Sequence, residues 1–284
     1  MRSKLKLGFR ILGYILIIHV LVSFIMVQIM TNPMQIESGR APDDYNLNYE
    51  DISFQAEDGV SLSGWYIKSF SDTDETVILM HGYPAESGDM LQEAAFLAQD
   101  FNIFMFDFRG LGQSEGDTTL GAKEVRDLHG AIDYLKEEKG VNQVSLWGFS
   151  MGGATTLQVT PERDEVVAVV SDSSYSSMGR SLQDIFPGRI LSKTFNPFIR
   201  FWARNFADIN IGKVSPEKSA REIEVPVYLI HSIDDPVIPI EHGKRLKKAM
   251  KDNQNLEVDF IDSDYHGGLD GSIRERLSDF LRVD

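Results

Sequence analysis

The sequence contains no cysteine among its 284 residues, which excludes a disulfide, a thiolate nucleophile and a zinc–thiolate site. It also lacks H-E-x-x-H and other metal-ligand spacings, and it has no Walker A sequence. The stretch DFRGLGQSEG (107–116) comes near the dinucleotide pattern G-x-G-x-x-G, but Glu115 stands where the third glycine would be. We therefore predict no metal and no cofactor, and we interpret Asp107 and Arg109 as a structural pair.

Positive charge is also scarce. The chain has 28 Lys and Arg against 43 Asp and Glu, a formal net charge of −15. Because the first 30 residues contribute +4, the remainder carries −19. A surface this acidic repels phosphate groups, which argues against nucleic acid as a partner.

An apolar run without Asp, Glu, Lys or Arg occupies residues 11–30. Twenty helical residues span about 30 Å, the thickness of a hydrocarbon core. The run exceeds the apolar core of a signal peptide and no A-x-A site follows, so we favour a transmembrane signal anchor over a cleaved signal. The basic flank, residues 1–10, predicts a cytoplasmic N-terminus and a single-pass protein of the cell membrane with its body outside. Residues 31–48, with two prolines and no periodicity, are predicted to form a stalk.

Residues 49–284 are interpreted as one α/β domain. Short β-prone runs alternate with helical patterns, which predicts a mostly parallel sheet covered by helices on both faces. The runs predicted as strands are 49–56, 60–68, 76–82, 102–110, 143–148, 166–171, 225–231 and 256–262. The stretches predicted as helices are 87–99, 121–139, 150–159, 240–251 and 270–282.

One long insertion, at about 173–224, has no strand pattern. Insertions of this length are usually functional. Asn196 followed by Pro197 suits the start of a helix, as cap and first-turn residue. We expect a helical lid over the carboxyl edge of the sheet. The aromatic residues expected to contact substrate are Phe195, Phe198 and Trp202.

The stretch GFSMG (148–152) places Ser150 between a predicted strand and a predicted helix. The pattern G-x-S-x-G at such a turn is typical of a nucleophilic serine, because the glycines leave room for a sharp turn that exposes the hydroxyl. The start of the helix also offers free N–H groups. The turn lies at the carboxyl edge of the sheet, where parallel α/β sheets bind ligands.

A serine nucleophile needs a base. Among the six histidines, His266 in DYHGG follows the last predicted strand, on the same edge as Ser150. His81 and His231 end strands and could be structural. The base needs an acid to orient it, and HSIDDPVIP (231–239) supplies two candidates, Asp234 and Asp235.

With these motifs the chain resembles the α/β-hydrolase fold, whose triad follows the same order of serine, acid and histidine. Within that fold it resembles the membrane-anchored serine hydrolases of the BEM46-like and serine-aminopeptidase-like group. The resemblance covers residues 49–284. Its motifs are HGYP (81–84), DFRGLGQSEG, GFSMGG (148–153), HSIDDPVIP and DYHGG.

The resemblance implies an eight-stranded sheet and selects Asp235 as the acid, with Asp234 as the alternative. It also implies an oxyanion hole made by the backbone N–H groups of Tyr83 and of Met151, the residue after the nucleophile. Ser232 stands where glycine is common in this family, and we expect little consequence.

The predicted reaction is hydrolysis of an ester, thioester or amide with an apolar acyl group through an acyl-enzyme. An esterase or lipase-like activity is favoured, and a peptidase acting on short peptides is the alternative. A membrane-anchored binding protein without catalysis is an alternative of another class, since fold does not fix function. The predicted partners are a small ester or short peptide and, through residues 11–30, the lipid bilayer.

Overall fold

The computed structural model describes residues 2–35, 37–186, 188–267, 269 and 271–282. Its centre is an eight-stranded sheet in the order β1-β2-β4-β3-β5-β6-β7-β8. The pairs β1–β2 and β2–β4 are antiparallel and the other pairs are parallel, which confirms the predicted mostly parallel sheet. The strands are β1 Tyr49–Gln55, β2 Ser61–Ile67, β3 Thr76–Met80, β4 Asn102–Phe106, β5 Val144–Phe149, β6 Val166–Asp172, β7 Val227–Ser232 and β8 Leu256–Ile261.

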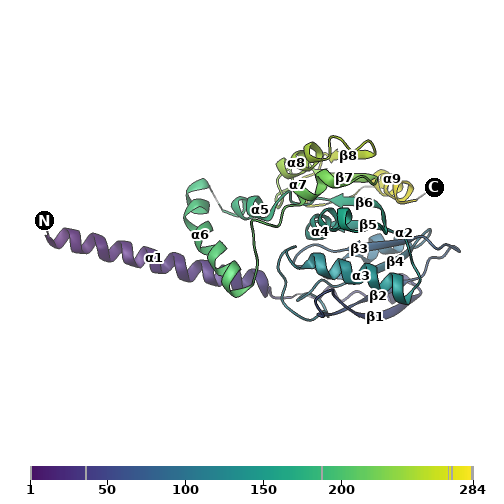
Figure 1. Cartoon of the computed structure of the whole chain (residues 1–284), viewed down its shortest axis with the longest axis horizontal. Coiled ribbons are helices and arrows are strands. Elements are labelled where there is room, and N and C mark those ends of the chain that lie inside the picture. Colours follow the sequence, from purple (N-terminus) through teal and green to yellow (C-terminus); the bar gives the residue numbers. More distant parts are fainter. Residues whose placement is uncertain (1, 36, 187, 268, 270, 283–284) are drawn as a thin grey trace.

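Helices cover both faces of this sheet (Figure 1). They are α1 Arg2–Thr31, α2 Leu91–Leu97, α3 Glu124–Glu138, α4 Met151–Val159, α5 Met178–Asp184, α6 Arg189–Phe206, α7 Pro216–Ser219, α8 Glu241–Ala249 and α9 Gly271–Leu281. Short 3₁₀ turns occur at Pro42–Tyr45, Ser87–Met90, Thr160–Glu162 and Ala220–Glu222. The predicted start of the last helix, residue 270, lies outside the described residues.

The side chains of β3 show why the sheet is buried on both sides. Ile78 and Met80 pack into one core with α3, α4 and α8. Val77 and Leu79 pack into a second core with α2 and α9. All five residues of β3 are buried, and each large aliphatic side chain contributes about 1.5–3 kcal/mol. This central strand holds its neighbour β5, and hence the turn after β5, in a fixed place.

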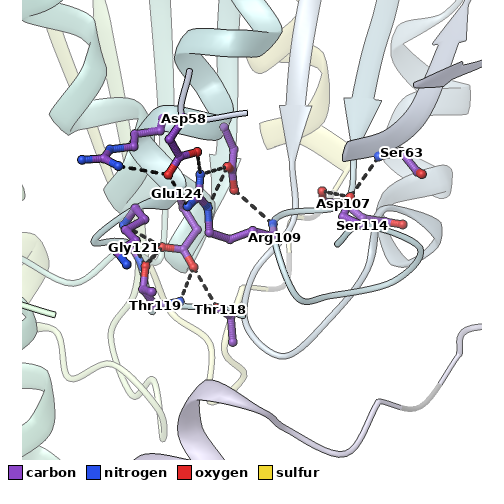
Figure 2. A network of polar contacts seen from close by, with 12 residues as sticks. Asp58, Ser63, Asp107, Arg109, Ser114, Thr118, Thr119, Gly121 and Glu124 are labelled. Atoms are coloured by element: carbon purple, nitrogen blue, oxygen red, sulfur yellow. Dashed lines mark hydrogen bonds and ion pairs between the residues drawn. The ribbon is translucent and has the colours of Figure 1, made fainter. Parts of the chain in front are cut away.

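Helix α3 begins three residues later than the sequence pattern predicts. The carboxylate of Glu124, its first residue, accepts hydrogen bonds from both hydroxyl and backbone groups of the preceding loop (Figure 2). The donors are the Thr118 hydroxyl, the Thr119 hydroxyl and N–H, and the Gly121 N–H, at 2.6–2.8 Å. Residues 121–123 therefore belong to a loop that folds around this carboxylate.

The helix of the insertion also differs from the prediction. Helix α6 starts at Arg189, not at Asn196, and Pro197 lies in its interior. Gly188, at φ 97°, makes the turn that precedes the helix. The Asn196 side-chain amide donates to the Ser192 hydroxyl at 3.3 Å instead of capping the helix. Because Pro197 has no N–H, the helix loses one internal hydrogen bond but continues.

Helix α1 projects from the domain (Figure 1). Its segment Lys4–Thr31 is long and apolar enough to cross a membrane, and most of its large apolar side chains are exposed. The segment predicted as a stalk lies along the domain. The Gln35 side-chain amide donates to the carbonyl oxygen of Gly110 at 2.9 Å, and the Ser38 N–H donates to the Glu86 carboxylate at 2.6 Å. These bonds tie the end of α1 to the body.

Candidate active site

Ser150 occupies a sharp turn between β5 and α4. Its φ of 53° and ψ of −111° are strained for a residue with a side chain. The surrounding glycines make this turn possible. A Cβ on Gly152 would lie 2.6 Å from the Met80 carbonyl oxygen, and one on Gly153 would lie 2.7 Å from the Gly148 carbonyl oxygen. The strands β3 and β5 and the helix α4 therefore approach each other more closely than side chains at these positions would allow. The resulting turn points the serine hydroxyl out of the sheet.

The structure brings Ser150 together with His266 and Asp235. The His266 Nε2 atom lies 2.8 Å from the Ser150 hydroxyl oxygen. The His266 Nδ1 atom lies 2.7 Å from the Asp235 Oδ2 atom. The three side chains come from the turn after β5, the loop after β7 and the loop after β8, all at the carboxyl edge of the sheet. This is a continuous hydrogen-bonded chain from serine to carboxylate.

Asp235 is held in its ionised form. Its side chain is fully buried, which by itself would raise its pKa. The hydrogen bond from His266 and two backbone donors outweigh burial and lower the pKa of Asp235. The two donors are the N–H groups of Val237 and Ile238, each 2.8 Å from Oδ1. The neighbouring Asp234 is exposed, so the structure places Asp235 and not Asp234 against the histidine.

The two residues predicted for an oxyanion hole lie beside Ser150. Met151 is the first residue of α4, where the N–H group has no partner within the helix. The loop carrying Tyr83 is also close, because a Cβ on Gly82 would lie 3.0 Å from the Ser150 Cβ. The Tyr83–Pro84 bond is cis and the Tyr83 ring is half-buried.

His81 and His231 have other hydrogen-bond partners. Burial lowers the pKa of His81, whose neutral ring accepts from the Phe108 N–H at 3.0 Å and donates to the Gly82 carbonyl oxygen at 2.7 Å. Burial also lowers the pKa of His231, whose Nε2 lies 2.8 Å from the Ile238 carbonyl oxygen. Both rings brace the loops that carry Tyr83 and Asp235.

Two further polar residues, Ser232 and Asp172, lie near the site. The hydroxyl of Ser232, at the end of β7, donates to the carbonyl oxygen of Gly267 at 2.7 Å. Asp172, at the end of β6, is buried behind the serine turn, and its carbonyl oxygen accepts the Ser150 N–H at 2.8 Å. Burial raises the pKa of Asp172 to about 7, although the Ser173 hydroxyl opposes the shift. A cavity of about 210 Å³ lies against Phe149, Asp172 and His266.

Asp107 and Arg109 do not pair with each other, contrary to our interpretation of the sequence. Arg109 binds Asp58 and Asp127 through its guanidinium group, at 2.6–2.9 Å (Figure 2). These hydrogen bonds hold the pKa of Asp58 well below its usual range. Asp107 accepts instead from the N–H groups of Ser87 and Gln113, at 2.8 and 2.9 Å. Both residues still brace loops at the carboxyl edge of the sheet.

The three aromatic residues predicted to contact substrate lie against α1. The Phe195 ring stacks on His19 with centroids 4.4 Å apart, and Phe198 lies 6.3 Å from the same ring. Trp202 donates from Nε1 to the Val20 carbonyl oxygen at 3.1 Å. Among the residues that the structure describes, none of the three makes a hydrogen bond or ring contact with the serine, histidine or aspartate. Their contact with substrate stays a prediction.

The parallel sheet, the serine turn and the hydrogen-bonded histidine and aspartate are together the arrangement of an α/β hydrolase. A family described as alpha/beta hydrolase fold matches residues 75–213. Uncharacterized protein YfhR of Escherichia coli (strain K12) is 31% identical over 249 residues, which cover 82% of this chain and 80% of YfhR. The chain therefore belongs to the alpha/beta hydrolase fold family, as the sequence motifs predict.

Two further similarities concern proteins with a stated activity. The lysophosphatidylserine lipase ABHD12 of Xenopus tropicalis is 24% identical, with 76% of this chain and 60% of ABHD12 covered. The esterase Pf2001 of Pyrococcus furiosus is 26% identical in sequence, has a TM-score of 0.72, and aligns over 89% of this chain and 97% of its own. The fold with esterase and lipase neighbours supports hydrolase activity. Within the described ranges, no group of three or more histidine, aspartate or glutamate residues could hold a metal ion.

Proposed function

We propose that this protein is a membrane-anchored serine hydrolase that cleaves carboxylic esters with an apolar acyl group. The observation that carries the proposal is the hydrogen-bonded chain from Ser150 through His266 to Asp235, with distances of 2.8 and 2.7 Å. In this chain His266 can take the proton of the serine hydroxyl, and Asp235 fixes the ring so that Nε2 faces the serine.

The proposed reaction has two halves. The Ser150 oxygen attacks the carbonyl carbon of the ester while its proton moves to His266 Nε2. The resulting oxyanion accepts hydrogen bonds from the N–H groups of Met151 and Tyr83. When the intermediate collapses, the bond to the alcohol breaks and the alcohol leaves with the proton from His266. Water then attacks the acyl-enzyme by the same route, which releases the acid and restores the serine.

The choice of an ester rests on the similar proteins. Their names include an esterase and a lipase that acts on a lysophospholipid. The same serine, histidine and aspartate can cleave a thioester or an amide, and a peptidase acting on short peptides is the second candidate. An apolar acyl group is proposed from the lysophospholipid in the name of ABHD12, because the cavity beside His266 is lined by charged as well as apolar side chains.

We also propose that α1 anchors the enzyme in the cell membrane. Residues 1–10 would lie in the cytoplasm, residues 11–30 would cross the bilayer, and the domain of residues 49–284 would lie outside. The exposed apolar surface of α1 and the basic residues at its start support this arrangement. Cysteine labelling of intact cells with a membrane-impermeant maleimide tests it in a variant with a single cysteine at Asp252. Labelling before lysis is expected, whereas labelling only after lysis would place the domain in the cytoplasm.

The activity is best tested on the full chain in detergent micelles. p-Nitrophenyl esters of increasing acyl length are compared with aminoacyl- and peptidyl-p-nitroanilides, for the wild type, Ser150→Ala and Ser53→Ala. Ser53 is an exposed serine of β1 and serves as the matched control. We expect ester turnover with an optimum of chain length that is lost only in Ser150→Ala. Anilide cleavage at comparable rates would favour the peptidase, and turnover independent of Ser150 would exclude both.

A further inference from the structure

Helix α6 is joined to α1 along one of its faces. Phe195 and Phe198 contact His19, and Trp202 contacts Phe24 edge to face at 5.1 Å. Deeper between the helices, Ile199 and Ala203 of α6 share a buried apolar cluster with Val27 of α1. The contacts therefore follow the half of α1 that is nearest to the domain, and α6 crosses α1 obliquely there (Figure 1).

The same helix leaves large apolar side chains uncovered. Ile190 is 81% exposed, Phe201 53% and Phe206 63%. Phe206 contacts Phe24 of α1 edge to face at 5.6 Å, and α1 leaves its own apolar side chains, such as Leu21 and Ile25, exposed. Soluble proteins rarely expose so many large apolar side chains on two packed helices, and where they do the exposed side chains mark a protein or membrane contact. Since α1 is the candidate membrane span, lipid is the partner that meets this surface wherever α1 crosses a bilayer.

The charged residues of α6 suit the headgroup region of a bilayer. Lys193 and Arg200 line an open groove of about 1130 Å³ between α6, α5 and α8, together with Arg180 and Arg245. Across the described part of the chain, Lys193, Arg200 and Arg245 form no ion pair with an acid. The groove also contains the carboxylates of Asp184, which is hydrogen-bonded to His242, and of Glu241, which pairs with Lys244. The three cations without an acid partner are unexpected in a body with a net charge of −19, and they complement anionic phosphates. Long basic side chains can also reach the headgroups while their stems stay in the apolar layer.

We propose that α6 is an interfacial membrane helix. Its exposed apolar side chains lie among the acyl chains of the leaflet from which α1 emerges, and Arg200, Arg245 and their neighbours bind the phosphates of anionic lipids there. Amphipathic helices with basic and aromatic residues bind membrane surfaces in this way. The inference rests on the proposed membrane anchoring by α1, but it is independent of the proposed chemistry of Ser150.

The arrangement would also set the position of the active site. The cluster that holds α1 and α6 includes Ala154 of α4, the helix after Ser150. It also includes Ile238, whose N–H donates to Asp235. A lipid surface at α6 would therefore be coupled through packed side chains to both loops of the proposed triad, and a substrate with an acyl chain could reach the site from the bilayer.

The absence of cysteine makes a direct test possible. Single cysteines replace Ile190, Phe201, Leu21 or Asp252 in the full chain, and each variant is spin-labelled and reconstituted in vesicles of phosphatidylcholine and phosphatidylglycerol. Collision with oxygen reports a lipid environment, and collision with a water-soluble nickel complex reports an aqueous one. We expect the labels at 190 and 201 to behave like the one at 21, on α1. The label at 252, on the exposed surface of the domain, should report water.

Two results would overturn the proposal. One is nickel accessibility at 190 and 201 equal to that at 252, which would place α6 in water. The other is protection from both reagents with spin–spin broadening, which would identify a second copy of the chain as the partner. Loss of ester turnover in Ser150→Ala leaves these label depths unchanged. A failure of the proposed chemistry is therefore distinguishable from a failure of this inference.

The role of the cations needs a second comparison. The label at 201 is expected to lie deeper in vesicles that contain phosphatidylglycerol than in phosphatidylcholine alone. The double variant Arg200→Gln and Arg245→Gln should abolish that difference. The control is Lys248→Gln with Lys251→Gln, which removes the same charge from exposed positions outside the groove. Equal depths in both vesicles for the wild type would overturn the binding of lipid phosphates.

Discussion

The hydroxyl of Ser232 donates a hydrogen bond of 2.7 Å to the carbonyl oxygen of Gly267, the residue that follows His266. Both partners are buried. The bond ties the histidine loop to the end of β7, the strand that leads to Asp235. Our expectation from the sequence, that a serine in place of glycine has little consequence, overlooked this contact between residues 35 positions apart.

We therefore expect Ser232→Ala to slow the chemistry more than it weakens substrate binding. Loss of the donor leaves the Gly267 carbonyl oxygen buried without its partner, at a cost of about 1–3 kcal/mol. The loop can relieve this only by moving, which displaces His266 from Ser150. A fall in kcat of about tenfold with an unchanged KM on a p-nitrophenyl ester is the expected result. Ser232→Thr should retain more activity because it keeps the hydroxyl, and equal rates for all three proteins would contradict a positioning role.

The two adjacent aspartates should respond very differently to substitution. Asp235→Asn keeps the shape of the side chain but favours the wrong tautomer of His266, so we expect kcat to fall by about 10³–10⁴-fold. Asp234→Asn is the matched control, because this side chain is exposed and outside the hydrogen-bonded chain. Steady-state rates of the two variants on the same ester decide the assignment. A large loss in Asp234→Asn with a small one in Asp235→Asn would reverse it.

Local patterns were enough to predict the sheet and the serine turn. The alternation of apolar strands and helices fixes the layers, and glycines at 148, 152 and 153 are needed wherever strand and helix cross so closely. What the pattern could not supply was pairing between distant residues. The partners of Arg109 are 51 and 18 residues away. The aromatic residues of α6 recur with the periodicity of any helix that buries one face. This periodicity does not reveal which element covers the face, so the contact with α1 could not be predicted.

The serine turn should not tolerate an added methyl group at Gly152, in the first turn of α4. In Gly152→Ala the new Cβ would lie 2.6 Å from the Met80 carbonyl oxygen and 2.8 Å from that of His81. Both are backbone atoms at the end of β3, so the helix itself must shift, at a cost of about 1–3 kcal/mol. We expect a lower Tm in detergent and a large loss of ester turnover. Gly271→Ala is the control, since its Cβ meets nothing within 4 Å, and an equal Tm for both variants would show that the turn has room.

The buried carboxyl of Asp172 should make stability depend on pH. An aspartate in an unfolded chain has a pKa of about 3.9, whereas burial raises that of Asp172 in the folded protein to about 7. At pH values between these two pKa values the folded state therefore binds more protons than the unfolded state. The free energy of unfolding falls as the pH rises through this window. Asp172→Asn removes the titration and keeps an oxygen that can accept from the Ser173 hydroxyl, 2.9 Å away.

We accordingly expect Asp172→Asn to raise Tm relative to the wild type by more at pH 8 than at pH 5. At pH 8 the wild type carries the buried charge, at a cost of up to about 1.4 kcal/mol per unit of pKa shift. At pH 5 Asp172 of the folded wild type is already protonated, so the two proteins should differ less. Asp252→Asn removes the same formal charge from the surface and controls for net charge. The two proteins could instead differ in Tm by the same amount at both pH values. That result would mean that Asp172 is ionised at both, with its charge stabilised by a hydrogen-bond donor that faces the cavity beside His266.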